Sequence, residues 1–130
     1  MGWVYSPKKQ NVKVSDDIKA TVNDKASKVV ELLRQKHINP ANNKEGFNYI
    51  VDIYSKWYRS YFYLCSKYET NSNDAIYPSY EVKFARMEYV DNHKFNLSYM
   101  RHTGKWQEIY QDLSVDECFD VILNEGLFLI

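Results

Sequence analysis

The sequence predicts an α+β protein made of a single domain: an N-terminal helix, an antiparallel meander of about five strands, and a C-terminal helix. Three observations support this prediction. A capped, amphipathic segment stands near each end of the chain, and runs of aromatic and β-branched residues with short turn sequences lie between them. The chain has 130 residues, the size of one domain. Aromatic residues make up 16% of it and 12 of them are tyrosines, which is typical of β-sheet.

The first helix is predicted at residues 15–37, SDDIKATVNDKASKVVELLRQKH. Ser15 is a suitable N-cap, Asp16 and Asp17 stand at the positive end of the helix dipole, and basic residues fill the last turn before Pro40. Helical spacing also produces one apolar stripe, which we expect to cover a sheet. Its members are Ile18, Val22, Ala26, Val29, Val30 and Leu33.

Two strands of a first hairpin are predicted at 47–54 and 61–68, where FNYIVDIY and YFYLCSKY are rich in aromatic and β-branched residues. The segment SKWYRS at 55–60 is expected to connect them as the turn. We expect ETNSNDAIYPS, residues 69–79, to be a loop.

A second hairpin joins EVKFARMEYV (81–90) to FNLSYMR (95–101) through DNHK. In that tight connection Asn92 tolerates positive φ, and Asp91 faces Lys94. The next connection is a three-residue loop that ends at Gly104, which we expect in the left-handed conformation that closes a type I turn with a bulge.

The last helix is predicted to start after Ser114, because Ser114 and Glu117 form a capping-box pattern. Val115, Phe119, Ile122 and Leu123 give this helix a buried stripe, and Gly126 ends it. We expect the two helices to cover one face of the sheet.

The C-terminal part of the chain carries a resemblance. The stretches FARMEYV, FNLSYMRH and GKWQEIYQDL, with the capped acidic helix that ends near Phe128, resemble a small bacterial family catalogued only as a domain of unknown function. The resemblance covers about residues 82–128 and rests on aromatic spacing rather than on a catalytic signature. It implies a fold and no function.

The 17 basic and 17 acidic residues give no net charge but are distributed unevenly. Residues 1–65 carry 11 lysines and arginines against 6 acidic residues, and residues 66–130 carry 6 against 11. Such asymmetry fits a basic arm for nucleic acid, and it equally fits a solvated charged helix.

Common cofactor and metal motifs are absent from the sequence: it contains no GxGxxG, Walker loop, HExxH or CxxC, and His37, His93 and His102 lack metal-ligand spacing. The sequence therefore predicts no cofactor and no metal. Cys65 and Cys118 show no disulfide framework, so we expect small core residues in a protein of the reducing cytoplasmic compartment.

Residues 1–14 are expected to form an extended arm whose aromatic residues Trp3 and Tyr5 pack on the domain. Met1, Gly2 and Ser6 fit a myristoylation pattern. Only Lys8 and Lys9 follow as a second membrane signal, and the chain has no membrane-length apolar run. We therefore expect no membrane partner.

Strand register suggests where a site lies. If Asp91 pairs with Lys94, Arg86 comes opposite Tyr99 and Glu88 opposite Leu97. If Arg101 pairs with Lys105, Gln107 comes beside Tyr99. One sheet face then carries the candidate ligand-binding residues, with His102 in the adjoining turn, and the opposite face carries Ala85, Met87, Met100 and Trp106. The candidates are Arg86, Tyr99, Arg101, His102 and Lys105.

Each candidate has a plain alternative. Arg86 and Glu88 form either part of a site or a surface ion pair. Arg101 and Lys105 form an anion site if a negative group sits between them, because neighbouring cations repel each other. His102 is either a general base or an ordinary surface histidine.

Our preferred hypothesis is a non-enzymatic binding module, whose aromatic and basic sheet face holds an anionic ligand, a peptide or a protein. The alternative is a single-strand nucleic-acid binder that uses stacking and phosphate contacts. Its contacts would come from Trp3, Lys8, Lys9, Lys13, Trp57 and Arg59. A small hydrolase that uses His102 and Arg101 is a third possibility.

Overall fold

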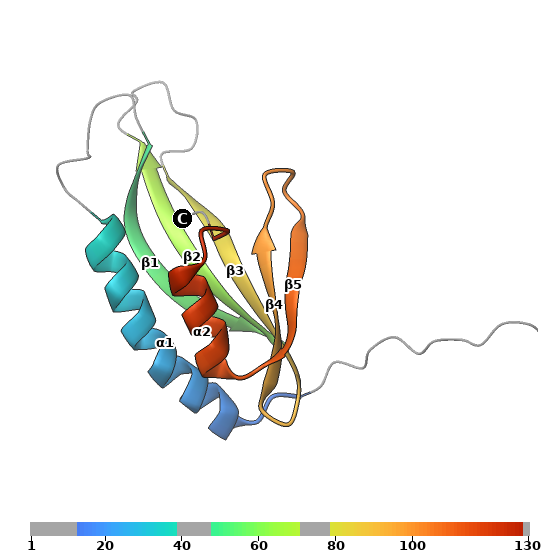
Figure 1. Ribbon diagram of the computed structural model, residues 1–130. Coiled ribbons are helices and arrows are strands. Elements are labelled where there is room, and N and C mark those ends of the chain that lie inside the picture. The colour runs from blue at the N-terminus through green and yellow to red at the C-terminus, as the bar shows by residue number, and fades with distance from the viewer. Residues whose placement is uncertain (1–12, 39–47, 71–78, 129–130) are drawn as a thin grey trace, which may run out of the picture.

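A computed structural model describes residues 13–38, 48–70 and 79–128 of the chain. Two helices and five strands follow one another in the predicted order (Figure 1). The elements are α1 (Asp16–His37), β1 (Asn48–Tyr58), β2 (Tyr61–Thr70), β3 (Ser79–Asp91), β4 (Lys94–Met100), β5 (Trp106–Leu113) and α2 (Val115–Asn124).

The five strands form one antiparallel meander in the order β1-β2-β3-β4-β5, and both helices cover the same face of it (Figure 1). The core lies between the two layers. Phe62 of β2 and Phe95 of β4 are fully buried there, together with Val22 of α1 and Cys118 of α2. The predicted α+β fold is confirmed, and within the part of the chain that the structure describes the opposite face of the sheet carries no helix.

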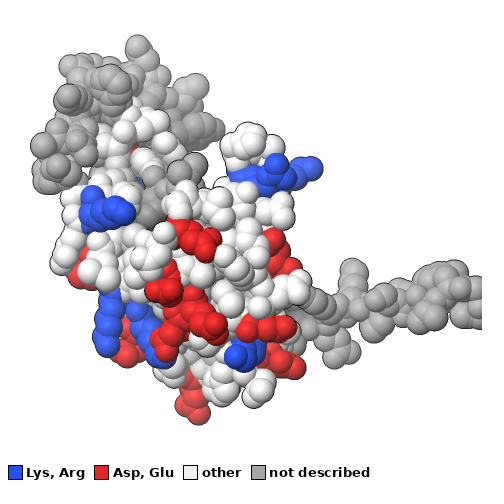
Figure 2. All heavy atoms as spheres, viewed as in Figure 1, with Lys and Arg blue, Asp and Glu red and all other residues white. Residues whose placement is uncertain are grey.

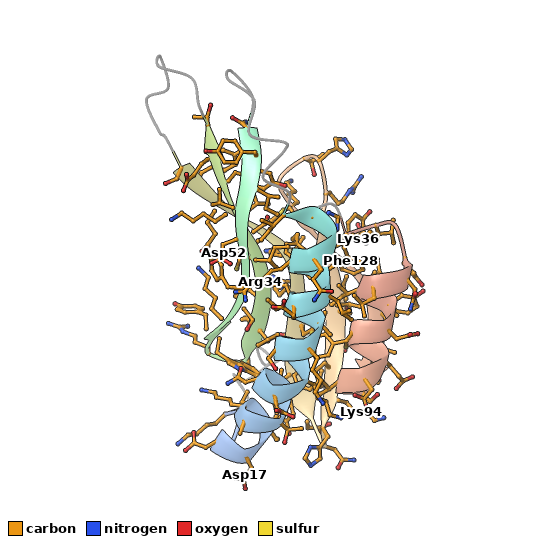
Figure 3. All side chains as sticks on the ribbon, turned by 90° about the vertical axis from the view of Figure 1, so that its left-hand side faces the viewer. Asp17, Arg34, Lys36, Asp52, Lys94 and Phe128 are labelled. Carbon is orange, nitrogen blue, oxygen red and sulfur yellow. The ribbon has the colours of Figure 1, made fainter. Side chains whose placement is uncertain are left out.

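Helix α1 begins and ends as predicted. The Ser15 hydroxyl accepts a hydrogen bond from the Ile18 amide at 3.2 Å, and the predicted apolar stripe is buried except for Ile18, which is half-buried. Arg34 anchors the helix to edge strand β1: its Nη2 lies 3.1 Å from Asp52 Oδ1, and its Nε donates to the Ile53 carbonyl at 2.9 Å (Figure 3). Pro40 lies outside the described residues.

The first hairpin differs from the prediction in its turn. Strand β1 continues to Tyr58, so the connection consists of Arg59 and Ser60 rather than all of 55–60. Arg59 takes the positive φ of 55° that so tight a turn requires. The aromatic residues that we assigned to the turn pair with β2 instead, since aromatic side chains fit a pleated surface.

The connection between β3 and β4 is the predicted tight turn. Asp91 pairs with Lys94, and both residues between them have positive φ, 46° for Asn92 and 61° for His93. Two positive φ values in a two-residue loop are the signature of a type I′ turn. Beyond it the ladder shifts by one residue between Tyr89 and Asp91. This β-bulge reverses which β4 residues share a face with β3.

The loop between β4 and β5 also forms as predicted. The Arg101 amide donates to the Lys105 carbonyl and the Gly104 amide to the Arg101 carbonyl, both at 2.9 Å, while Gly104 has a φ of 83°. The register that follows pairs Tyr99 with Gln107.

We expect Gly104→Val to lower the free energy of unfolding by about 1 to 2 kcal/mol, measured by chemical denaturation. A Cβ at this position meets no atom within 4 Å, so the cost comes from the left-handed backbone and not from a clash. Gly104→Asn is the matched control, because asparagine tolerates that conformation. Equal stability of the valine variant and the parent would contradict the assigned loop.

Helix α2 starts with the predicted capping box. The Ser114 hydroxyl accepts from the Glu117 amide at 3.2 Å, and the Glu117 carboxylate accepts from the Ser114 amide at 3.0 Å. The backbone amide of Ser114 also holds the pKa of Glu117 below its ordinary value.

Ser114→Ala is expected to destabilise the protein by about 1 kcal/mol, because the N-cap acceptor is lost. Thermal and urea denaturation measure the change. Ser27→Ala serves as the control, since Ser27 lies within α1 and its hydroxyl donates only to the Asp24 carbonyl. If the two variants behave alike, the cap does not stabilise α2.

Candidate functional site

The face of the sheet opposite to α1 and α2, which we call the open face, gathers aromatic and cationic side chains. The orientation of β2 defines it: the Phe62 ring lies 6.3 Å from the Phe119 ring of α2, so its neighbours Tyr61 and Tyr63 point away from the helices. Tyr63 pairs with Arg86 of β3, which places Arg86 on the open face as well. Figure 3 shows side chains projecting from the sheet on the side away from both helices.

Three aromatic residues of the open face gather around Arg86 and form with it what we call the aromatic–arginine cluster: Tyr61, Tyr63 and Trp106. The guanidinium carbon lies 5.0 Å from the ring centroid of Tyr61 and 5.0 Å from that of Trp106. The Tyr63 ring lies 6.1 Å from Tyr61 and 5.9 Å from Trp106. Cation–π contacts of this kind contribute about 0.5 to 2 kcal/mol each. The rings therefore fix the guanidinium in one place.

The Nε atom of Arg86 is buried and has no hydrogen-bond partner among the residues that the structure describes. Buried polar atoms normally have a hydrogen-bond partner, and a buried donor without one costs desolvation free energy. The ring contacts therefore hold the Arg86 side chain in place against this desolvation cost. Beside it, burial raises the pKa of Tyr61, and the charge of Glu88 adds to that effect. Tyr61 therefore remains an uncharged ring at neutral pH.

A pocket of about 320 Å³ adjoins the cluster. Its lining residues are Lys56, Trp57, Tyr58, Tyr63 and Lys83. The Lys83 ammonium lies 5.2 Å from the Tyr63 ring centroid, and Lys56 forms an ion pair with Glu81 at 2.6 Å. Hydrogen bonds from Lys56 and then from Tyr54 lower the pKa of Glu81. The pocket thus combines tyrosine rings with two lysines, one of them paired.

The predicted site residues do not share one face, which corrects the sequence-based register. The bulge in β3 places Arg86 opposite Ser98, and Tyr99 lies opposite Ala85 on the helix side, with its ring 6.4 Å from Phe128. Trp106, predicted on the face opposite to Arg86, is in contact with it. The Arg86 and Tyr99 side chains therefore lie on opposite faces of the sheet.

The remaining predicted residues, Arg101, His102 and Lys105, are exposed in the β4–β5 loop. Basic side chains stand at the tip of that hairpin in Figure 2. The backbone hydrogen bond from Arg101 to Lys105 holds the two cations side by side. Their role in ligand binding stays a prediction.

If Arg101 and Lys105 bind anions, we expect sulfate to raise the melting midpoint of the protein. A ligand that binds only the folded state stabilises it by about 1 kcal/mol when its concentration is several times the dissociation constant. Arg101→Ala should lose this response and retain normal stability. Chloride at equal ionic strength controls for general salt effects. Arg59→Ala, a change in the exposed turn between β1 and β2, should keep the response. Identical responses of Arg101→Ala and the parent would make the β4–β5 loop a structural turn only.

The stacking role proposed for Trp57 meets a packed environment. Its Nε1 donates to Asn23 of α1 at 3.0 Å, and its ring lies 5.0 Å from Phe62. Arg59 lies over the Tyr58 ring at 5.2 Å. Trp3, Lys8 and Lys9 lie outside the described residues, as do Tyr5 and the myristoylation pattern of Met1, Gly2 and Ser6.

Both cysteines are free and fully buried, as predicted. Burial raises the pKa of Cys65 to about 11 and that of Cys118 to about 12, so neither thiol is ionised at neutral pH. Within residues 13–38, 48–70 and 79–128, no group of three or more histidines, cysteines and acidic residues is placed to hold a metal ion.

The fold and the open face define an α+β domain with two helices on one side of a five-stranded antiparallel meander. The chain belongs to the family described as "Domain of unknown function (DUF3024)", whose model matches residues 14–129. The resemblance therefore extends far beyond residues 82–128, to which the sequence analysis confined it. Neither the curated proteins nor the solved structures include a significant match to the chain. No helix in the described part of the chain is long and apolar enough to cross a membrane.

Proposed function

We propose that this protein is a binding module whose open face docks an acidic segment of a protein or peptide partner. The observation that carries the proposal is the Arg86 guanidinium, held between the rings of Tyr61 and Trp106 at 5.0 Å from each. Tyrosine, tryptophan and arginine are the residues enriched at the energetic centres of protein interfaces.

The cluster is assembled before any partner arrives, because ring–ring and ring–cation contacts already fix its side chains. Preorganised side chains lower the entropic cost of association. The partner therefore meets a rigid aromatic surface.

The lysines of the pocket that adjoins the cluster favour a carboxylate. Lys83 and Lys56 line the adjoining pocket, and Glu81 neutralises Lys56. The Lys83 ammonium is left over the Tyr63 ring, where a carboxylate of the partner can pair with it. An acidic segment with an aromatic or aliphatic anchor fits this arrangement.

Titration with matched peptides tests the proposal. Two peptides share one hydrophobic anchor and differ in charge, one being rich in aspartate and the other in lysine. Each is titrated into the parent protein, into Arg86→Gln, and into Lys28→Gln of α1 as the control. We expect the parent and Lys28→Gln to prefer the acidic form and Arg86→Gln to lose that preference. Binding that ignores peptide charge, or that survives Arg86→Gln, contradicts the proposal.

Nucleic acid remains the alternative, because three neighbouring rings with cations beside them also suit base stacking. A single-stranded oligonucleotide included in the same titration separates the two. Oligonucleotide binding that falls steeply as the salt concentration rises would favour nucleic acid as the ligand. No oligonucleotide binding at low salt would remove the nucleic-acid alternative.

A further inference from the structure

A groove separates the two helices on the face opposite to the open face. Its lower part, of about 400 Å³, has Val29 of α1 and Phe119 of α2 among its lining residues. A second pocket of about 360 Å³ lies further along the same helices, between the last turn of α1 and the end of α2. Leu123 lines both pockets, so the two adjoin, and we call them together the α1–α2 groove.

The two rims of this groove carry opposite charges. Lys28 and Lys36 line it from α1, and Asp120 and Glu125 line it from the α2 side. Figure 2 shows basic side chains over α1 beside acidic side chains over α2. Neither Lys28 nor Lys36 forms an ion pair with any residue in the described part of the chain.

The charges and apolar residues of the two rims also lie at matching levels. The ion pair between Lys25 and Asp116, at 2.9 Å, sets a common starting level, and both helices run in the same direction from it (Figure 1). With a rise of about 1.5 Å per residue, Lys28 lies about 4.5 Å and Asp120 about 6 Å further along.

At the same rise, Leu32 and Leu123 each lie about 10 Å from that starting level. Leu32 is 54% exposed. Lys28 and Asp120 thus lie at one level of the groove, and Leu123 lines it about one turn further along. Leu32 lies at the level of Leu123 on the exposed surface of α1.

We propose that the α1–α2 groove is the interface of a homodimer, with the two-fold axis parallel to the helices. Rotation about such an axis exchanges the two rims and keeps every level, so α1 of each copy lies over α2 of the other. Lys28 then meets Asp120 of the second copy, and Leu32 meets Leu123 of the second copy.

A second copy suits the groove because one surface supplies both halves of the charge pattern, which is what an isologous interface requires. The patch is small, since α2 spans about 15 Å and two helices are about 20 Å wide. Its footprint falls below the roughly 800 Å² per partner of a standard stable interface. The dimer is therefore expected to dissociate on dilution and in high salt.

Sedimentation equilibrium of the full chain from about 1 to about 500 µM tests the proposal. The mass should rise from 15.5 kDa toward twice that value with concentration. Lys28→Glu and Asp120→Lys should each weaken association at least tenfold, because each places like charges opposite one another twice. An equimolar mixture of the two variants should associate again, since every facing pair then carries opposite charges.

Lys83→Glu on the open face is the control and should associate like the parent, which separates this proposal from the proposed function. Melting midpoints verify that every variant is folded. A mass of 15.5 kDa at all concentrations overturns the proposal. So does a mixture of the two charge variants that remains monomeric, or an association that both single variants retain.

Discussion

Phe62→Ala is expected to lower the free energy of unfolding by about 3 to 5 kcal/mol, measured by urea denaturation. Phe62 is fully buried in β2. The centroid of its ring lies 5.0 Å from that of Trp57 and 6.3 Å from that of Phe119. Trp57 is hydrogen-bonded to α1 and Phe119 belongs to α2, so this one ring links both helices to the sheet. Its truncation leaves a cavity where the two layers meet.

Tyr58→Ala provides the control for that measurement. Tyr58 lies on the neighbouring strand and is 57% exposed, so its truncation should change stability by no more than about 0.5 kcal/mol. A loss below about 1 kcal/mol for Phe62→Ala would contradict the packing that we assign to the core.

Trp106→Ala is expected to weaken partner binding at least about 30-fold, the effect of removing an aromatic hot spot of about 2 kcal/mol. Trp106 lies on edge strand β5, contacts Arg86 and Tyr63, and remains partly exposed. Its removal takes away one of the two rings that hold the guanidinium. Isothermal titration with an acidic peptide measures the change.

Arg86→Lys tests the geometry of the same cluster. Lysine keeps the positive charge and loses the planar guanidinium that stacks between two rings. We expect it to bind more weakly than the parent, yet more tightly than Arg86→Gln. Equal affinities of the parent and Arg86→Gln would show that the charge has no role.

Local sequence signals were sufficient to predict the fold. Ser15 and Ser114 marked the starts of both helices, and Gly104 and Asn92 marked two turns, because capping and positive φ depend on neighbouring residues only. The first turn was predicted too long, because we assigned Trp57 and Tyr58 to it. In the structure both residues pair with β2.

The site was predicted less well, because it depends on a register that one bulge reverses. We derived the register from the Asp91–Lys94 turn and carried it past Tyr89, where the ladder shifts. The alternation of apolar residues was the better signal: Ala85, Met87 and Tyr89 match Tyr99, Leu97 and Phe95 in the observed register, all on the helix side. That pattern would have placed Arg86 on the open face.

The contact between Arg86 and the rings of Tyr61 and Trp106 had no signal in the sequence. The three residues belong to β3, β2 and β5, and only the meander order brings them together. Trp106 and Arg86 are on strands that do not pair with each other, so no hairpin rule relates them.

Photo-crosslinking from the open face tests the central claim most directly. A benzophenone amino acid replaces Tyr58, which lines the pocket; this replacement leaves the aromatic–arginine cluster intact. In the control variant the same amino acid replaces the exposed Ser27 of α1. In native cells we expect position 58 to capture an acidic segment of a partner protein, and Arg86→Gln to abolish that capture. Capture at position 58 that does not exceed capture at position 27, or that persists with Arg86→Gln, would contradict a docking role for the open face.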